Sequence, residues 1–224
     1  MSNIQKVLQT ILVSFRDHPA APVTLSRPVV CLSRDFGSGG DAIGSLLAKR
    51  LGVDFYDRQI LERIAHRLKT DPAMIEALNG GAAPLRGIWL YGAVTSGRPL
   101  LDDYRQTLAD VVIGIAHADG GVILGHGAHL VLANSGALRV RITGSAAARA
   151  KRIETRDGVD AAEARRLVTE ADERRDRFLR DNFKVKGGDD SVFDVVINTD
   201  RLDGDEKIVD ILMTLMSIRH LPAS

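Results

Sequence analysis

Short apolar segments alternate with longer helical segments along most of this chain, and this alternation limits the possible folds more than any other feature. The apolar segments are residues 28–34, 53–57, 121–125, 138–144 and 192–199. Between them, apolar residues recur at helical spacing, for example over 41–52 and 160–182. Buried strands that alternate with helices are typical of a parallel sheet covered on both faces. We therefore predict a three-layer α/β fold with a five-stranded parallel sheet and helices on both faces.

The first 27 residues differ from this pattern. Residues 4–15 carry one apolar stripe at helical spacing, and three prolines follow within residues 17–28. Proline cannot continue a helix, so this stretch is predicted to be a linker. We predict an N-terminal helix and proline-rich linker over 1–27 and a single domain over 28–224. The sequence leaves open whether the helix packs on the domain or on a second subunit, which would give a homodimer.

Composition narrows the class of protein. The formal net charge is +1 and only 4% of the 224 residues are aromatic, which argues against a nucleic-acid-binding protein. No apolar run approaches the roughly 20 residues that cross a bilayer, and no signal peptide is recognisable, so no membrane association is expected. The single cysteine, Cys31, lies in the first apolar segment and is interpreted as a core residue. These features favour a cytoplasmic location.

A glycine-rich loop, "SRDFGSGGDAIG", follows the first strand directly. Its glycines allow backbone amides to converge on an anion, and the helix that begins near Asp41 adds its positive dipole end. The predicted phosphate-binding residues are Arg34, Gly37, Ser38, Gly39, Gly40, Asp41 and Ala42. The ordinary phosphate loop reads G-x-x-x-x-G-K-[ST]. Here Gly40 stands at the lysine position and Asp41 at the hydroxyl position.

These segments together resemble the cytidylate kinase-like family, in the nucleoside monophosphate kinase group of P-loop proteins. The resemblance runs from about Val29 to Leu202. It rests on the loop, on "VILGHGAHLVL" before "LRVRITGSAAARAKRI", on "ADERRDRFLRDNF" and on "FDVVINTDRL". It implies a P-loop kinase fold with a helical lid over about 150–190, and binding of ATP with Mg²⁺.

Two departures from the family pattern concern charge. Removing one preorganised donor costs about 3–4 kcal/mol of transition-state stabilisation, so the missing lysine needs a substitute. Arg34, which occupies the first loop-glycine position, is the candidate cation. After the third strand, cytidylate kinases carry Gly-Arg-Asp, whereas this chain has His126 and Gly127 there. His126 binds phosphate only if protonated, or it is a structural residue of the turn.

The resemblance also implies roles for acceptor and metal ligands. Asp57 follows the second strand and Arg63 lies six residues later, the spacing at which monophosphate kinases contact the acceptor. Asp57 would orient an acceptor hydroxyl, and Arg63 would clamp a phosphate. The structural alternatives are a helix cap for Asp57 and a solvated helix face for Arg63. Asp41 and Asp57 are candidate Mg²⁺ ligands, with a helix-terminal acid as the alternative for Asp41.

The helical segments after the fourth strand carry the candidate lid residues. These are Arg149, Arg152, Arg174, Arg175 and Arg180. In relatives this region folds arginines over the phosphates, and the alternative is an exposed salt-bridged helix. The resulting hypothesis is an ATP- and Mg²⁺-dependent phosphotransferase that acts on a nucleotide or another small acceptor. A non-catalytic nucleotide-binding or regulatory protein, and a dimeric interaction protein that retains only the fold, are the alternatives.

Overall fold

The computed structural model describes residues 25, 27–69, 71, 75, 100–118, 120–202 and 204–219. The predicted N-terminal helix and most of its linker lie outside these residues. So does most of the segment 71–100, for which the sequence offered no motif.

The centre of the molecule is the predicted five-stranded parallel sheet. Its strands are β1 (Val29–Arg34), β2 (Phe55–Tyr56), β3 (Gly121–Leu124), β4 (Leu138–Thr143) and β5 (Val195–Asn198). They lie in the order β2-β3-β1-β4-β5, and every neighbouring pair is parallel. All five carboxyl ends therefore lie at one edge. This edge brings together the segments that the sequence analysis placed after strands one to four.

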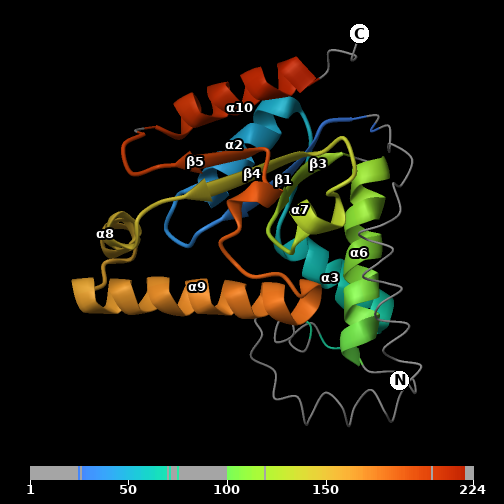
Figure 1. The fold of residues 1–224 in the computed structure, drawn as a ribbon, viewed down its shortest axis with the longest axis horizontal. Coiled ribbons are helices and arrows are strands. Elements are labelled where there is room, and N and C mark those ends of the chain that lie inside the picture. The colour runs from blue at the N-terminus through green and yellow to red at the C-terminus, as the bar shows by residue number, and fades with distance from the viewer. Residues whose placement is uncertain are drawn as a thin grey trace.

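Helices cover both faces of the sheet (Figure 1). They are α2 (Gly40–Leu51), α3 (Arg58–Leu68), α6 (Leu100–Ala118), α7 (Ala128–Val131), α8 (Ala146–Asp157), α9 (Ala161–Phe183) and α10 (Asp205–Arg219). The side chains of β1 alternate between two cores. Val29 and Cys31 pack with α3, α6 and α7, whereas Val30 and Leu32 pack with α2 and α10. The three-layer prediction is confirmed, and Cys31 is a buried core residue.

The predicted fifth strand is longer than the observed one. Residues Asp190–Val192 form a 3₁₀ turn, and the side chain of Asp189 accepts a hydrogen bond from the backbone amide of Ser191. The strand β5 begins only at Val195. An aspartate that caps its own turn favours this local geometry over an extended strand, although valine and phenylalanine follow it.

A smaller third core joins α8 and α9. It consists of Ala150 and Ile153 from α8 with Ala164 and Val168 from α9, and Phe36 from the glycine-rich loop packs against it. Figure 1 shows α9 running beneath the sheet, with α8 near one of its ends. The loop after β1 is thus attached to the helix pair that the sequence predicted to be a lid.

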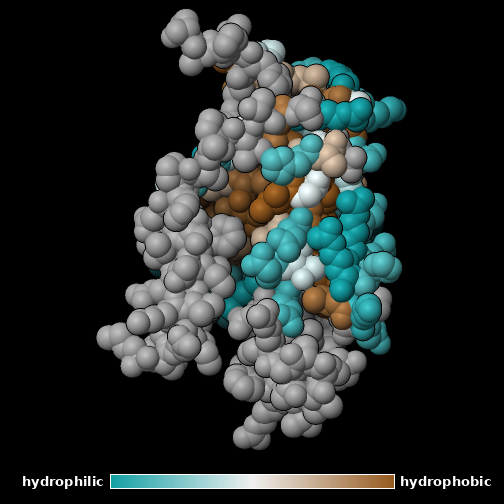
Figure 2. Space-filling view, turned by 90° about the vertical axis from the view of Figure 1, so that its right-hand side faces the viewer, coloured by the Kyte–Doolittle hydropathy of each residue, from teal (hydrophilic) through white to brown (hydrophobic). Residues whose placement is uncertain are grey.

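The side of the molecule that carries α6 shows hydrophobic residues bordered by hydrophilic side chains (Figure 2). The sheet-facing positions of α6 belong to the larger core, for example Leu108, Val112 and Ile115. Among the described helices, none combines the length and apolar character needed to cross a bilayer.

Candidate phosphate-binding site

The loop between β1 and α2 has a backbone that only glycine adopts readily. Gly37 and Gly39 have φ angles of +80° and +87°. A Cβ at Gly37 would also lie 2.8 Å from the carbonyl oxygen of Arg149. Gly39 is the N-cap of α2 and provides no side-chain cap. The first N–H groups of a helix lack intrahelical partners, so the amides at Gly40, Asp41 and Ala42 are available as donors, and we call them the amide cradle.

Arg34 lies across this cradle. A Cβ placed on Gly40 would lie 2.9 Å from Arg34 Cγ and closer still to Arg34 Cβ. The guanidinium continues to Asp41, with Nε and Nη2 each 3.2 Å from Oδ1. A Cβ on Gly125, after β3, would lie 3.2 Å from Arg34 Nη1. The arginine stem therefore occupies the space that a side chain at the lysine position would need, and its guanidinium lies beside Asp41 and Gly125.

Ser38 contributes its backbone to the loop and its side chain to the core. Its hydroxyl donates to the Ile142 carbonyl oxygen at 3.2 Å, and the residue is 2% exposed. The buried hydroxyl of Thr199 donates to the Ser38 carbonyl oxygen at 3.1 Å. The loop is therefore tied to the carboxyl ends of β4 and β5, which makes the cradle rigid.

Asp57 and His126 meet beside Arg34 at the ends of β2 and β3. His126 Nε2 lies 3.1 Å from the Asp57 carbonyl oxygen and 3.6 Å from its carboxylate. A carbonyl oxygen can only accept, so Nε2 carries a proton. Burial alone would raise the pKa of Asp57, but His126 and the charges of Arg34 and Arg58 outweigh it and lower that pKa. Asp57 is the N-cap residue of α3, yet its side chain makes no capping hydrogen bond.

The predicted acceptor residue Arg63 has a different neighbour. It is exposed on α3, and its guanidinium carbon lies 5.1 Å from the centre of the Tyr56 ring. This is a cation–π contact with the last residue of β2. Arg63 thus lies almost two turns along α3 from Asp57, and its described contact is with Tyr56.

Among the predicted lid residues, Arg149 is the most firmly held. It pairs with both carboxylate oxygens of Asp172 at 3.0 and 2.8 Å. It also donates to the carbonyl oxygens of Gly144 at 2.9 Å and Phe36 at 3.2 Å. Four donors of this buried guanidinium are thereby used within the protein. Arg149 joins the glycine-rich loop, α8 and α9 together.

The other lid candidates fall into two groups. Arg152 donates to the carbonyl oxygens of Thr199 and, at 3.5 Å, of Gly37, so it also lies against the loop. Arg174 and Arg180 are exposed on α9. The structure brings Arg149, Arg152 and Arg175 to the loop but leaves Arg174 and Arg180 on the solvent side of the helix.

Asp35, which the sequence analysis did not select, is the buried centre of an ion-pair network. Its carboxylate accepts from Thr143 Oγ1 at 2.6 Å, from Arg141 Nη2 at 3.3 Å and from Arg175 Nη1. Arg141 also pairs with Asp190 at 2.6 Å. Burial lowers the pKa of Arg175 despite the nearby acids Asp176 and Asp190. This network fixes the loop to β4 and to α9.

One sequence signal could have indicated this network. In "LRVRITG" the arginines stand at alternate positions of an apolar strand, so they share one face. Because β4 lies inside the sheet and not at its edge, these charges need buried partners. Their partners, Asp35, Asp190 and Asp194, are remote in sequence, so spacing alone does not identify them.

The sheet order, the glycine-rich loop after β1 and the helix pair α8–α9 define the chain as a P-loop kinase fold. The chain belongs to the cytidylate kinase-like family, whose profile matches residues 29–201. No curated protein matches it.

Solved structures with similar folds have low sequence identity. An uncharacterized protein from Eubacterium ventriosum has a TM-score of 0.63 at 19% identity, covering 85% of this chain and 99% of that chain. Shikimate kinase from Bacteroides thetaiotaomicron has a TM-score of 0.49 at 16% identity, covering 86% and 99%. Shikimate kinase from Acinetobacter baumannii, in complex with shikimate, has a TM-score of 0.48 at 16% identity, covering 91% and 99%. At these identities, the likeness concerns the fold alone.

Proposed function

We propose that the chain is a phosphotransferase that passes the terminal phosphoryl group of ATP to a nucleotide or another small acceptor. The observation that carries this proposal is the position of Arg34, whose stem crosses Gly40 and whose guanidinium lies between Asp41 and Gly125. A cation over the amide cradle is what transfer of a charged phosphoryl group requires. The altered loop therefore retains a cation, supplied from the opposite side, although Asp41 adds a carboxylate beside it.

Asp57 and His126 are proposed to face the acceptor. The lowered pKa of Asp57 keeps it a carboxylate at neutral pH, so it orients an acceptor hydroxyl more than it stores a proton. His126 supplies the proton on Nε2 that holds the Asp57 backbone in place. In the transfer, the bond between the β,γ-bridging oxygen and the γ-phosphorus breaks while the acceptor oxygen forms a new bond to that phosphorus. The products are ADP and a phosphorylated acceptor, and a hydroxyl acceptor also releases its proton to water.

The donor set fits a Mg²⁺ ion carried by the nucleotide. Among the described residues, no group of three or more His, Cys, Asp and Glu side chains could hold a metal. Mg²⁺ beside nucleotides is usually held by one or two carboxylates, phosphate oxygens and water, so Asp41 and Asp57 suffice. When bound, Mg²⁺ neutralises developing charge on the phosphate oxygens. Arg34 must leave Asp41 for that carboxylate to serve.

The lid arginines are proposed to divide into two roles. Arg149 supports the loop, because Asp172 and two carbonyl groups already occupy its donors. Arg152, Arg174, Arg175 and Arg180 remain candidates for contact with phosphate when substrates bind. Closure of α8 and α9 over the loop would exclude water, which otherwise would hydrolyse ATP.

A second candidate function is nucleotide binding without transfer, in a regulatory protein. It is favoured by the Arg34–Asp41 ion pair, which neutralises the cation proposed to replace the loop lysine. It is also favoured by Arg149, because Asp172 and two backbone carbonyl groups already occupy the donors that would otherwise contact phosphate. The two functions predict the same binding and differ only in product formation.

The test combines binding and turnover. In titrations with ATP and Mg²⁺, Arg34→Ala should weaken binding at least tenfold, because a charge-assisted contact contributes about 1.5–3 kcal/mol. Lys49→Ala is the matched control, since Lys49 is an exposed cation of α2, the helix that follows the glycine-rich loop. Equal effects of the two substitutions would show that Arg34 does not contact ATP. Turnover is then measured with a panel of nucleoside monophosphates and small hydroxy acids as acceptors. A phosphorylated product supports the phosphotransferase, whereas ATP binding with no product from any acceptor supports the second function.

A further inference from the structure

The large apolar side chains that are exposed in the described part of the chain share one location. They are Val196, Leu202, Ile211 and Ile218, which are 39%, 42%, 46% and 58% exposed. Val196 belongs to β5, Ile211 and Ile218 belong to α10, and the fourth residue lies between these elements. Single exposed apolar residues are common on protein surfaces, but a group from consecutive elements indicates an interaction surface.

β5 is an edge strand of the sheet and lacks the usual protection of a strand edge. Within the described chain it pairs with β4 only, so the backbone groups on its outer side are open to another strand. Edge strands are usually protected by charged side chains, by proline or by a very short length. The opposite edge strand, β2, has only two residues, whereas β5 (Val195–Asn198) has four, and none of these is charged or proline.

α10 presents an apolar flank on the same side of the molecule. Glu206 pairs with Arg50 of α2 at 3.3 Å, so this flank of α10 faces the helix that packs on β1 and β3. Ile211, the partly buried Leu215 and Ile218 recur at i, i+4 and i+7. At about 100° per residue they lie on the opposite flank, toward the outer edge of the sheet. We call these three residues the α10 stripe.

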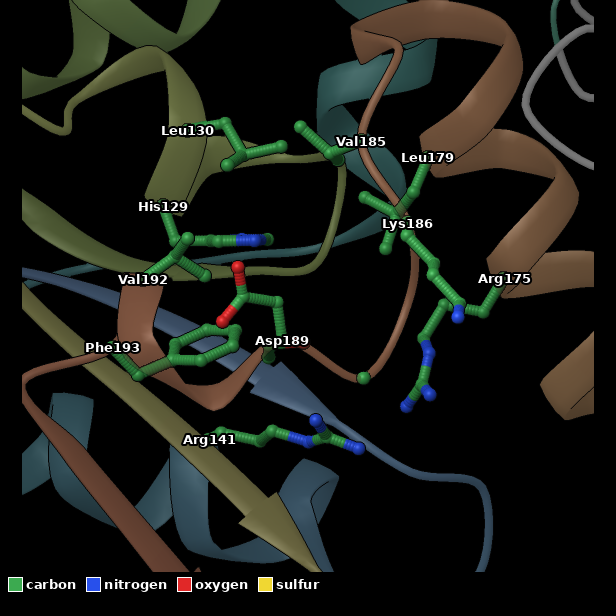
Figure 3. Close-up of a pocket in the computed structure, with 12 residues that line it drawn as sticks. His129, Leu130, Arg141, Arg175, Leu179, Val185, Lys186, Asp189, Val192 and Phe193 are labelled. Carbon is green, nitrogen blue, oxygen red and sulfur yellow. The ribbon is translucent and has the colours of Figure 1, made fainter.

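The hollow between α7, α9 and the segment 185–193 differs from this surface, because its charges are balanced within the fold (Figure 3). Arg141 and Arg175 in its wall share the carboxylate of Asp35. Arg141 also pairs with Asp190. These side chains are thus satisfied internally, whereas the apolar residues of β5 and α10 are covered by none of the described elements.

The N-terminal segment of the chain approaches from the opposite face of the sheet. Leu25, the first described residue, packs against the core formed with α3, α6 and α7, whereas α10 packs against the other core. Residues 1–24 would therefore have to pass around the sheet to cover the α10 stripe. A second copy of the chain meets no such obstacle, because it presents the same open edge and the same apolar flank.

The geometry of this surface suits a two-fold axis. Two copies of β5 can pair in antiparallel orientation, since the open donors and acceptors of a strand match those of the same strand reversed. The same axis makes the two α10 helices antiparallel, so their dipoles oppose one another. Lys207, an exposed charge in the first turn of α10, then lies at opposite ends of the helix pair in the two copies. Like charges are thereby kept apart.

We propose that two copies of this chain associate through β5 and the α10 stripe, which joins their sheets into one continuous sheet. Val195 and Ile197 pack toward α10, so Val196 points to the other face of the sheet. In the dimer, Val196 of the two copies would lie close together on that face, and the two α10 stripes would cover each other on the α10 face. Such an interface is isologous, because each copy contributes the same residues. It does not rest on phosphoryl transfer.

Sedimentation of the full chain without nucleotide tests this association. The native chain should sediment as a dimer at micromolar concentration. The double variant Ile211→Glu/Ile218→Glu and the single variant Val196→Lys should each weaken association at least about tenfold, because each buries a charge in the interface. Thr155→Glu/Thr169→Glu is the matched control, since it adds the same charge at exposed positions of α8 and α9 and should leave the dimer intact.

Cross-linking tests the position of the axis. The native chain has one cysteine, Cys31, and it is buried. A cysteine introduced near a two-fold axis meets its own copy, so Val196→Cys should give a cross-linked dimer with a short bismaleimide. Thr155→Cys, at an exposed position of α8, should remain a single chain under the same conditions.

Three results would overturn the proposal: a native chain that sediments as a monomer, a dimer that survives in both surface variants, or equal weakening in the control double variant. Leu8→Glu separates this surface from the apolar stripe of residues 4–15. If Leu8→Glu abolishes the dimer while Val196→Lys does not, the N-terminal segment joins the two copies and the β5 surface is wrong.

Discussion

Replacing Gly40 by alanine tests whether Arg34 and a side chain at position 40 exclude one another. Gly40 has an ordinary helical backbone at the start of α2, so alanine by itself would gain up to about 1 kcal/mol in helix propensity. In the native chain, however, the new Cβ would lie 2.9 Å from Arg34 Cγ and closer still to Arg34 Cβ. Rotation about χ1 can move Arg34 Cγ, but Arg34 Cβ cannot move away without a shift of the backbone. Overpacking of this kind costs about 1–3 kcal/mol.

We expect Gly40→Ala to destabilise the native chain by about 1–2 kcal/mol and to stabilise the Arg34→Gly chain by up to about 1 kcal/mol. The coupling free energy of the double-mutant cycle should thus be about 2 kcal/mol. Urea unfolding of the four chains measures it. Gly114→Ala in α6 is the control, since nothing lies within 4 Å of a Cβ there, and it should stabilise both backgrounds equally. Additive effects at positions 34 and 40 would refute the reasoning.

Two further predictions concern buried charge. Asp35→Asn should lower the free energy of unfolding by at least about 2 kcal/mol in a urea assay, because it leaves Arg141 and Arg175 without their shared carboxylate. The control is Asp157→Asn, which removes the exposed partner of Arg156 and should have little effect. Equal losses of stability in the two variants would contradict the role of Asp35. The pKa of His129 is lowered to about 4, so the unfolded chain binds the proton more readily and stability falls as the pH drops below about 6.5. Between pH 7.5 and pH 5 the native chain should lose about 2 kcal/mol more than His129→Gln. Replacing the exposed His117 by glutamine should leave the pH dependence of the unfolding free energy as it is in the native chain. If His129→Gln also keeps the native pH dependence, the lowered pKa assigned to His129 is wrong.

The layers of the fold follow from local patterns in the sequence. Val29 and Cys31 alternate with Val30 and Leu32, and this two-sided apolar pattern is what a buried parallel strand requires. The sequence also predicts where helices end, for example at Gly52, which has a φ angle of +67° and is the C-cap of α2. These features depend on interactions between near neighbours in the chain. Periodicity and turn chemistry therefore predict them.

The charge pairing of the candidate site was not predictable in the same way. Arg149 was expected to face phosphate, yet Asp172 lies on the facing helix at the right distance to pair with it. Asp35 was passed over although it lies inside the glycine-rich loop, because its partners Arg141 and Arg175 are more than 100 residues away. Which of several arginines meets which carboxylate depends on the packing of α9 against the sheet. No local pattern encodes that packing.

Phe36, in the glycine-rich loop, packs against the core between α8 and α9. Two polar contacts also join the loop to these helices: Arg149 of α8 donates to the Phe36 carbonyl oxygen, and Arg175 of α9 donates to the Asp35 carboxylate. Opening the helix pair away from the sheet would require all three attachments to yield together. The loop and the pair should therefore belong to one cooperative unit in native-state hydrogen exchange, with amides of α9 and α2 exposed by a common opening. In such a molecule, a substrate that orders the loop also slows the local unfolding of helices that it never touches.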